Sequence, residues 1–459
     1  MDAKRAAALK KIYARVLKEI KPGKLEIEAT TANANRIMGR LKKVVPRNVE
    51  IMIVGSISRS TNLKGDHDID IFLLFDKKVP EKRMESLGVE YAKRIANRKG
   101  ERIEIKYAEH PYVRLHLDEI GMKIDLVPAY KIRSIEERAT AVDRTPLHTK
   151  FLNENLTDKQ RDDVRLLKCL LKSHGIYGAE VRTQGFSGYL CELLIFTFGS
   201  LNGLLEEAAK FRVPLYIHPR EKGAKAGDAF KKFNSEFIVI DPVDKTRNVA
   251  AGVSKESLAR LVMVARLLID HPGIGSFYGK GFSALSAKRD FTGIIKRANL
   301  NSYIIAAKVP DKSDDIIWPQ LRKASEIILD SAKKSGFRIY LSAVWVEKGH
   351  GFMLFLSPKE VLTTRLFTGP SPLRNSSASI AFIKAHNKAI GAVMTGDIVN
   401  VIDFNRYETL EALLMEAVAG KITGKRKDIS LKGAKLFANN VPKEYSETVY
   451  AELISMLSI

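Results

Sequence analysis

Apolar residues recur at helical spacing through the first 20 residues, and Pro22 and Gly23 mark the end of this predicted helix. A second helical segment continues to about Leu41. From residue 49 onward the pattern changes to alternating or unbroken apolar runs, which are typical of β-strands. The expected strands cover residues 49–55, 68–75, 102–110, 112–119 and 122–130.

These patterns divide the chain into three predicted domains. A helix at about residues 81–98 interrupts the strands, so we expect residues 1–143 to form an α+β domain with a mixed sheet. After a turn signal at residues 144–146, residues 144–275 are mainly helical. The expected helices there cover residues 158–175, 188–211 and 254–271, the last with Ser254 as its N-cap.

The third predicted domain, residues 276–459, has an α/β pattern. A strand at 303–309, a helix at 321–336 and a hairpin at 338–357 favour, as one candidate, a sandwich like that of RNA-recognition domains. Residues 359–403 indicate an insertion or appendage, and we expect the last 50 residues to be helical. This tail carries a basic run that predicts contact with RNA phosphates: Lys421, Lys425, Arg426 and Lys427.

The charge balance indicates a polyanionic partner. The 459 residues contain 76 Lys and Arg against 53 Asp and Glu, which leaves a formal net charge of +23. Because the basic residues are spread along the whole chain, nucleic acid fits better than a membrane surface. A generally basic protein without such a partner stays the alternative.

Cysteine use and the start of the chain indicate a cytoplasmic protein. Cys169 and Cys191 lie in apolar helical patterns, so we expect buried free thiols rather than a disulfide or a zinc site. The charged amphipathic start lacks the apolar core of a secretory signal, and no apolar run approaches the roughly 20 residues of a membrane span. We therefore expect no membrane partner.

Three acids in the predicted sheet carry the candidate chemistry. Asp68 and Asp70 are two residues apart on one strand, so their carboxylates point to the same face. Such close carboxylates repel each other unless a divalent cation holds them ionised, and Mg²⁺ prefers sparse carboxylate ligation completed by phosphates. Asp125 lies inside another apolar strand, where an unpartnered charge is costly, so a third metal ligand is the simplest explanation.

The strand end before these acids suits a phosphate. Gly55 allows a tight turn with close backbone approach, Ser56 and the following amides can hydrogen-bond a phosphate, and Arg59 adds positive charge. The three catalytic acids can hold two magnesium ions, the first two bridging both metals and the third binding the metal at the attacking 3′ hydroxyl. Three solvated acids at strand ends are the alternative.

The spacing Gly-Ser, eleven residues, Asp-Ile-Asp-Ile and a later Ile-Asp-Leu resembles the DNA polymerase beta nucleotidyltransferase superfamily. The resemblance narrows to the archaeal, class I CCA-adding tRNA nucleotidyltransferases at VDRTPLHTKFL, VRLLKCLLKSHGIYGAE, GFSGYLCELLI and IDPVDKTRNVAAGVS. It covers most of the chain, closely to about Arg260 and more loosely beyond. The resemblance implies a polymerase-beta-like head, a helical neck and a C-terminal RNA-binding body with a helical tail.

The resemblance also implies the reaction. Members of this family add C, C and A to the 3′ end of tRNA from CTP and ATP, without a nucleic-acid template. In that family the positions of Thr145, His148, Lys168 and Tyr177 hold the ribose and triphosphate, and that of Arg247 faces the base. The residues themselves leave open a structural role for His148 and local packing for Tyr177.

Lys168 belongs to a basic stripe on one predicted helix face, together with Arg161, Arg165 and Lys172. Such a stripe is usually a solvated face, and that alternative stays open for Arg161 and Lys172.

Two other functions also stay open. One is a poly(A)-polymerase-like RNA 3′-terminal nucleotidyltransferase, and the other is an RNA-binding protein with an inactive transferase domain. The sequence does not decide between a monomer and a homodimer.

Overall fold

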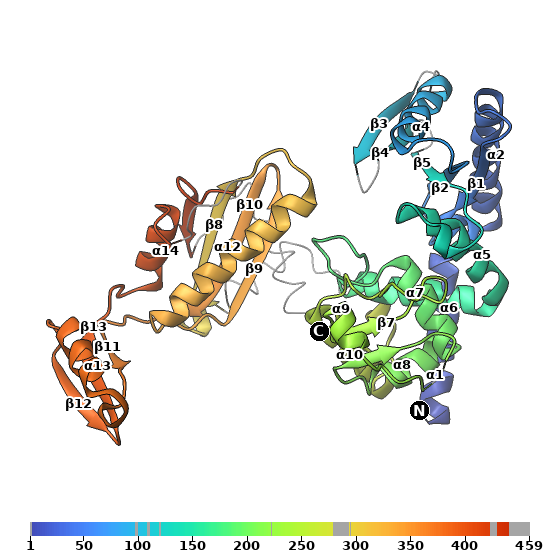
Figure 1. Cartoon of the computed structure of the whole chain (residues 1–459). Coiled ribbons are helices and arrows are strands. Elements are labelled where there is room, and N and C mark those ends of the chain that lie inside the picture. The colour runs from blue at the N-terminus through green and yellow to red at the C-terminus, as the bar shows by residue number, and fades with distance from the viewer. Residues whose placement is uncertain are drawn as a thin grey trace. The chain divides into compact units, whose positions relative to one another are not determined.

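The computed structural model describes residues 2–96, 100–107, 111–118, 121–221, 223–278, 293, 295–422 and 429–439. The chain divides into two compact units, Met1–Lys280 and Gly281–Ser458 (Figure 1). The first unit contains both the sheet and the helical region that the sequence predicts as separate domains. The predicted boundary between residues 143 and 144 stays a prediction.

The strands of the first unit's large sheet are β1 (Glu50–Val54), β2 (Asp68–Phe75), β3 (Glu101–Tyr107), β4 (Pro111–Leu117) and β5 (Met122–Tyr130). Their order is β1-β2-β5-β4-β3. β2 and β5 run parallel while the other neighbours are antiparallel, which confirms the expected mixed sheet. All five strands overlap the predicted ones, while residues 108–110 and 119 of two predicted strands lie outside the described residues.

The helices that precede or connect these strands are α1 (Ala3–Ile20), α2 (Lys24–Val44), α3 (Gly55–Ser58) and α4 (Glu81–Ile95). Leu9 and Val16 of α1 belong to the core of the helical part of this unit rather than to the core of the sheet. α2 and α4 pack on one face of the sheet. Ile69 and Ile71 of β2 face this side and are fully buried in one core with Ile37 and Met84. Asp70 lies between the two isoleucines, so its side chain points to the opposite face.

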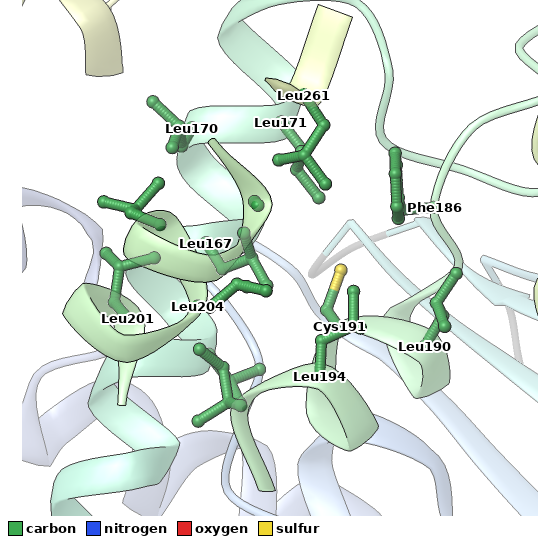
Figure 2. Packing of buried hydrophobic residues seen from close by; sticks show 14 of the residues in the cluster. Leu167, Leu170, Leu171, Phe186, Leu190, Cys191, Leu194, Leu201, Leu204 and Leu261 are labelled. Carbon is green, nitrogen blue, oxygen red and sulfur yellow. The ribbon is translucent and has the colours of Figure 1, made fainter. Parts of the chain in front are cut away.

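The helical part of the first unit contains α5 (Thr145–Asn155), α6 (Asp158–Ser173), α7 (Gly188–Phe198), α8 (Leu201–Ala208), α9 (Ala229–Phe233), α10 (Lys255–Asp270), strands β6 (Leu215–Ile217) and β7 (Phe237–Val239), and 3₁₀ turns at Ile135–Glu137, Val142–Arg144 and Ile274–Phe277. Leucines of α6, α7 and α8 meet around Cys191 in one core, as Figure 2 shows. Cys169 and Cys191 are free, as predicted, and burial raises the pKa of the Cys191 thiol to about 12.

The prediction of one helix over residues 188–211 is wrong. The chain breaks at Gly199, which adopts a left-handed φ of 79°, and Ser200 caps α8 by accepting the Gly203 N–H. These local signals override the continuous apolar pattern. Among the described residues no single helix has the length and apolar composition to cross a membrane, and α7 with α8 passes that test only as a pair bent by 92°.

The second unit contains a four-stranded antiparallel sheet in the order β14-β8-β10-β9. The predicted hairpin is confirmed and turns at Lys348 and Gly349. The prediction that the last 50 residues are helical is confirmed at α14 and wrong at β14, where Leu436 packs against the core of this sheet. Residues 423–428 and 440–459 of this tail lie outside the described residues. The elements are β8 (Leu300–Lys308), α12 (Asp314–Lys334), β9 (Leu341–Glu347), β10 (His350–Pro358), α14 (Leu410–Val418) and β14 (Lys435–Ala438).

The segment predicted as an appendage forms a sheet of its own, in the order β11-β13-β12. Its elements are β11 (Thr364–Thr368), α13 (Pro372–Ala385), β12 (Gly391–Thr395) and β13 (Ile398–Phe404). Of the predicted basic run, Lys421 follows α14, and its Nζ lies 2.6 Å from Oε1 of Glu416. Lys425, Arg426 and Lys427 lie outside the described residues.

Candidate active site

The three predicted acids lie on the two parallel strands β2 and β5. Asp70 is the direct register partner of Asp125, and Asp68 lies two positions before Asp70. Partners on neighbouring strands share a face, as do alternate residues of one strand. The structure therefore brings all three carboxylates to the face of the sheet that α2 and α4 leave open.

The electrostatics of this cluster suit a cation. Burial, followed by the charge of Asp125, raises the pKa of Asp70 from 3.8 to about 7. Asp68 adds to the rise, whereas Arg59 and Arg114 oppose it. A divalent cation would supply the positive charge that a fully ionised set of carboxylates needs, so the donor chemistry fits Mg²⁺.

Arg114 on β4 is the partner of Asp125 in this structure. Its Nε and Nη2 each donate to one carboxylate oxygen of Asp125 over 2.7 Å, and the two residues face each other across β4 and β5. Within the part of the chain that the structure describes, no three acidic, histidine or cysteine side chains form a ready-made metal cage. In this structure Arg114 therefore balances the charge of Asp125, and the role of Asp125 as a third metal ligand stays a prediction.

At Gly55 the backbone passes very close to the carboxylate of Asp70. It follows Val54, the register partner of Asp70, and adopts a φ of 78°. A Cβ atom on Gly55 would lie 2.1 Å from Oδ2 of Asp70. Only glycine combines this backbone conformation with this contact. A contact of Ser56, the next residue, with a phosphate stays a prediction.

Arg59 is buried, unlike an arginine that waits in solvent for a phosphate. Its Nε lies 3.0 Å from both carboxylate oxygens of Glu192 on α7, and its Nη1 lies 3.2 Å from Oγ1 of Thr149 on α5. A contact between Arg59 and a nucleotide stays a prediction. In this structure Arg59 links the end of α3 to the helical region.

The basic stripe of α6 is buried only in part. Arg165 and Lys168 are buried and Arg161 is half-buried, whereas Lys172 is exposed, so the solvated-face alternative fits Lys172 but not Arg161. Lys168 is 2% exposed, and its Nζ donates to the carbonyl oxygen of Thr61 over 3.0 Å. Burial lowers the pKa of Lys168. A Cβ on Gly188, at the start of α7, would lie 3.2 Å from the hydroxyl of Tyr177 and 3.7 Å from Nζ of Lys168. Two predicted nucleotide ligands therefore meet at this point.

Two of the remaining predicted ligands, His148 and Arg247, lie next to Asp241. His148 lies one turn after Thr145, the first residue of α5, and its Nε2 is 2.8 Å from Oδ2 of Asp241. Nη1 of Arg247 is 3.1 Å from the same oxygen, and the hydroxyl of Tyr189 donates to Oδ1 over 3.0 Å. The rings of His148 and Tyr189 stack with centroids 4.2 Å apart. Burial lowers the pKa of His148, although Asp241 opposes that shift.

Three family models match successive parts of the chain. A nucleotidyltransferase domain matches residues 34–148, and the second domain of tRNA nucleotidyltransferases matches residues 162–278. The C-terminal domain of CCA-adding enzymes matches residues 301–434.

Curated relatives align over most of the chain. The CCA-adding enzyme of Methanocaldococcus jannaschii is 38% identical over 83% of this chain and 85% of its own length. The CCA-adding enzyme of Picrophilus torridus is 35% identical over 95% of this chain and 99% of its own length. This chain belongs to the CCA-adding enzyme family. A solved structure of Cid1 poly(U) polymerase is 18% identical and covers 59% of this chain and 98% of that one, with a TM-score of 0.48.

In this member of the CCA-adding family, sequence reasoning missed the acids that hold the basic site residues. Asp241 binds His148 and Arg247, and Glu192 binds Arg59. Both acids stand in segments that carry the family resemblance, but a carboxylate gives no sign of a partner far away in the chain. The signal for Glu192 was its place inside the apolar run LCELLI, since glutamate is rarely buried without a partner.

Proposed function

We propose that this chain adds C, C and A to the 3′ end of tRNA in the cytoplasm, from CTP and ATP and with release of pyrophosphate. The observation that carries the proposal is the pairing of Asp70 with Asp125 on parallel strands, with Gly55 directly against Asp70. The family supplies the choice of tRNA and nucleotides. The net charge of +23 supports a polyanionic substrate.

The strand-borne acids are the residues that would hold magnesium. Asp68 and Asp70 share a face, and Asp125 joins them once it releases Arg114. When bound there, Mg²⁺ favours the ionised 3′ hydroxyl and stabilises negative charge on the transferred phosphate.

Different basic residues suit the binding of different parts of the nucleotide. Lys168 and Tyr177 suit the triphosphate and ribose, because their polar ends meet at Gly188. Arg247 suits the base, because Asp241 holds one end of its guanidinium while the side chain stays 34% exposed. The remaining N–H groups of its planar guanidinium can donate hydrogen bonds to the acceptor atoms of cytosine or adenine.

The reaction is tested with tRNA that lacks its terminal CCA, each labelled nucleoside triphosphate and magnesium. We expect incorporation of C before A, and sequencing of the products should show ends that stop after CCA. Incorporation of ATP alone into long tails would indicate a poly(A)-polymerase-like enzyme instead. Tight tRNA binding without any incorporation would indicate an inactive transferase domain.

Asp70 is expected to make the metal-free protein less stable as the pH rises from 3.8 to about 7. In this window the unfolded chain has released the Asp70 proton while the folded chain retains it, so the free energy of unfolding falls with rising pH. Magnesium should oppose this loss, because it binds the ionised carboxylate. We expect Mg²⁺ to raise the melting temperature more at about pH 8 than at about pH 5.

Thermal unfolding with and without Mg²⁺ checks this expectation, with Asp70→Asn as the control. The variant should lose most of the magnesium-dependent shift at both pH values. An equal magnesium shift in wild type and variant would place the ion elsewhere.

Arg247→Ala is expected to lower the discrimination of CTP and ATP against other nucleotides by about tenfold to a hundredfold. The affinity for tRNA should stay within about twofold, because Arg247 faces the base rather than the RNA backbone. Competition between labelled nucleotides measures the first quantity, and filter binding measures the second. Lys245→Ala, an exposed cation of the same loop, is the matched control and should leave selection intact. Collapsed tRNA affinity with unchanged selectivity would contradict this assignment.

A further inference from the structure

Glu192 is a fully buried acid to which the proposed reaction gives no role. It follows Cys191 on α7, and Cys191 points into the leucine core (Figure 2). Consecutive residues of a helix point in directions about 100° apart, so Glu192 leaves this core for a different neighbour. Its side chain is 0% exposed, and an ionised carboxylate at such depth requires partners.

The partners of Glu192 come from the chain between the glycine turn and the catalytic acids. Arg59 donates from Nε to both carboxylate oxygens over 3.0 Å. Thr61 donates its hydroxyl to Oε1 over 2.5 Å. Although burial opposes ionisation, Arg59 and Lys168 lower the pKa of Glu192 overall. The acid is thus a charged acceptor at the centre of a small network.

The α6 stripe completes the attachment of this loop. Arg161 donates from Nε to the carbonyl of Arg59 over 3.0 Å. Arg165 donates to the carbonyls of residues 60 and 62 over 2.6 and 2.9 Å, and Lys168 donates to the carbonyl of Thr61 over 3.0 Å. Cationic side chains of α6 therefore donate to the four successive carbonyls of residues 59–62. Glu192 accepts hydrogen bonds from the side chains of Arg59 and Thr61 in the same segment.

The loop held in this way connects both halves of the candidate active site. It begins just after Ser56 and ends before Asp68. Arg59 also acts on the charge of Asp70, so the network reaches the catalytic carboxylates. Two buried cations, Arg59 and Lys168, face one buried anion. The excess positive charge suits the arrival of a triphosphate.

We propose that Glu192 is a positioning residue for nucleotide addition: by binding Arg59 and Thr61 it holds the loop between Ser56 and Asp68 in the geometry that receives the triphosphate. This inference rests on the proposed function. Glutamine keeps one acceptor oxygen for Arg59 but carries no charge, so the buried Arg59 guanidinium loses its counter-ion, and Thr61 has to turn its hydroxyl to accept from the new N–H₂ group. A glutamine at position 192 therefore keeps the volume of the side chain but releases part of the loop.

Glu192→Gln is expected to lower kcat/KM for CTP and ATP by about tenfold to a hundredfold, mainly through a higher KM. Affinity for tRNA should stay within about twofold. Asp163→Asn is the matched control, since Asp163 is another buried acid of this region and accepts the Leu201 N–H away from the loop. That control should leave the nucleotide KM near the wild-type value, because the amide oxygen of asparagine can still accept the Leu201 N–H.

A double-mutant cycle with Arg59→Ala separates positioning from general support of the fold. If Glu192 acts through Arg59, Glu192→Gln should change the nucleotide KM by less than about threefold in the Arg59→Ala background. An undiminished effect in that background would overturn the inference, as would wild-type kinetics of Glu192→Gln.

If Glu192→Gln does not fold, Thr61→Val provides a second test of the positioning role of Glu192. It removes one donor to Glu192 and leaves the ion pair with Arg59 in place. We expect a nucleotide KM several-fold higher than in wild type with unchanged tRNA affinity, and an unchanged KM would count against positioning. A wild-type protein that adds no nucleotide to tRNA would refute the proposed function itself, which is a separate outcome.

Discussion

Replacing Asp70 with asparagine is expected to lower the rate of nucleotide addition by about 10³-fold or more. Asparagine keeps the shape of the side chain but removes the negative charge from the strand that pairs with both Val54 and Asp125. Single-turnover incorporation of C into tRNA lacking its CCA end measures the loss. Because burial disfavours the ionised form of Asp70, the metal-free variant should melt no lower than the wild type at neutral pH.

Asp76→Asn is the matched control for this experiment. Asp76 directly follows β2, and its carboxylate accepts the N–H of Lys78 over 2.9 Å in an exposed turn. The substitution removes one charge from the end of the same strand without altering the site, so we expect a rate near that of the wild type. Full incorporation by Asp70→Asn in the presence of magnesium would refute the catalytic assignment.

Gly55→Ala is expected to lower the rate of addition by about 10²-fold. The new Cβ would lie 2.1 Å from Oδ2 of Asp70, and the short aspartate side chain can relieve that clash only by turning its carboxylate away. Rotation moves a proposed metal ligand while the surrounding sheet keeps its fold. The loss of stability should therefore be modest, about 1–2 kcal/mol, mostly from the left-handed backbone.

Gly65→Ala separates the steric effect from the backbone effect. Gly65 also adopts a φ of 78°, but a Cβ there would meet nothing within 4 Å. We expect a loss of stability of about 1 kcal/mol and little change in rate. Equal losses of rate in the two variants would assign the effect to backbone strain rather than to displacement of Asp70.

Much of the fold could be predicted because its signals are local. β2 is buried on both faces along most of its length, and a strand in that situation reads as a nearly continuous apolar run. The first six residues of β5 instead alternate between buried and more exposed positions, which is the period of a half-buried strand. The N-cap predicted at Ser254 is confirmed by its hydrogen bond to the Ser257 N–H. The predictions at residues 188–211 and at β14 failed, because turn chemistry at Gly199 and packing of Leu436 outweighed the average pattern.

The order of residues along the chain was enough to place two aspartates on one face of a strand, a glycine at the preceding strand end and a third acid in another strand. Those conclusions depend on the period of a strand and on the cost of an isolated buried charge, and both can be judged from neighbouring residues. The partners of the basic residues required the folded chain. Arg59 and Glu192 are separated by 133 positions, and the α6 cations reach carbonyls more than 100 positions away. Apolar periodicity specifies which face of a helix is buried but not which distant charge it meets, because that depends on how the sheet and the helices pack together.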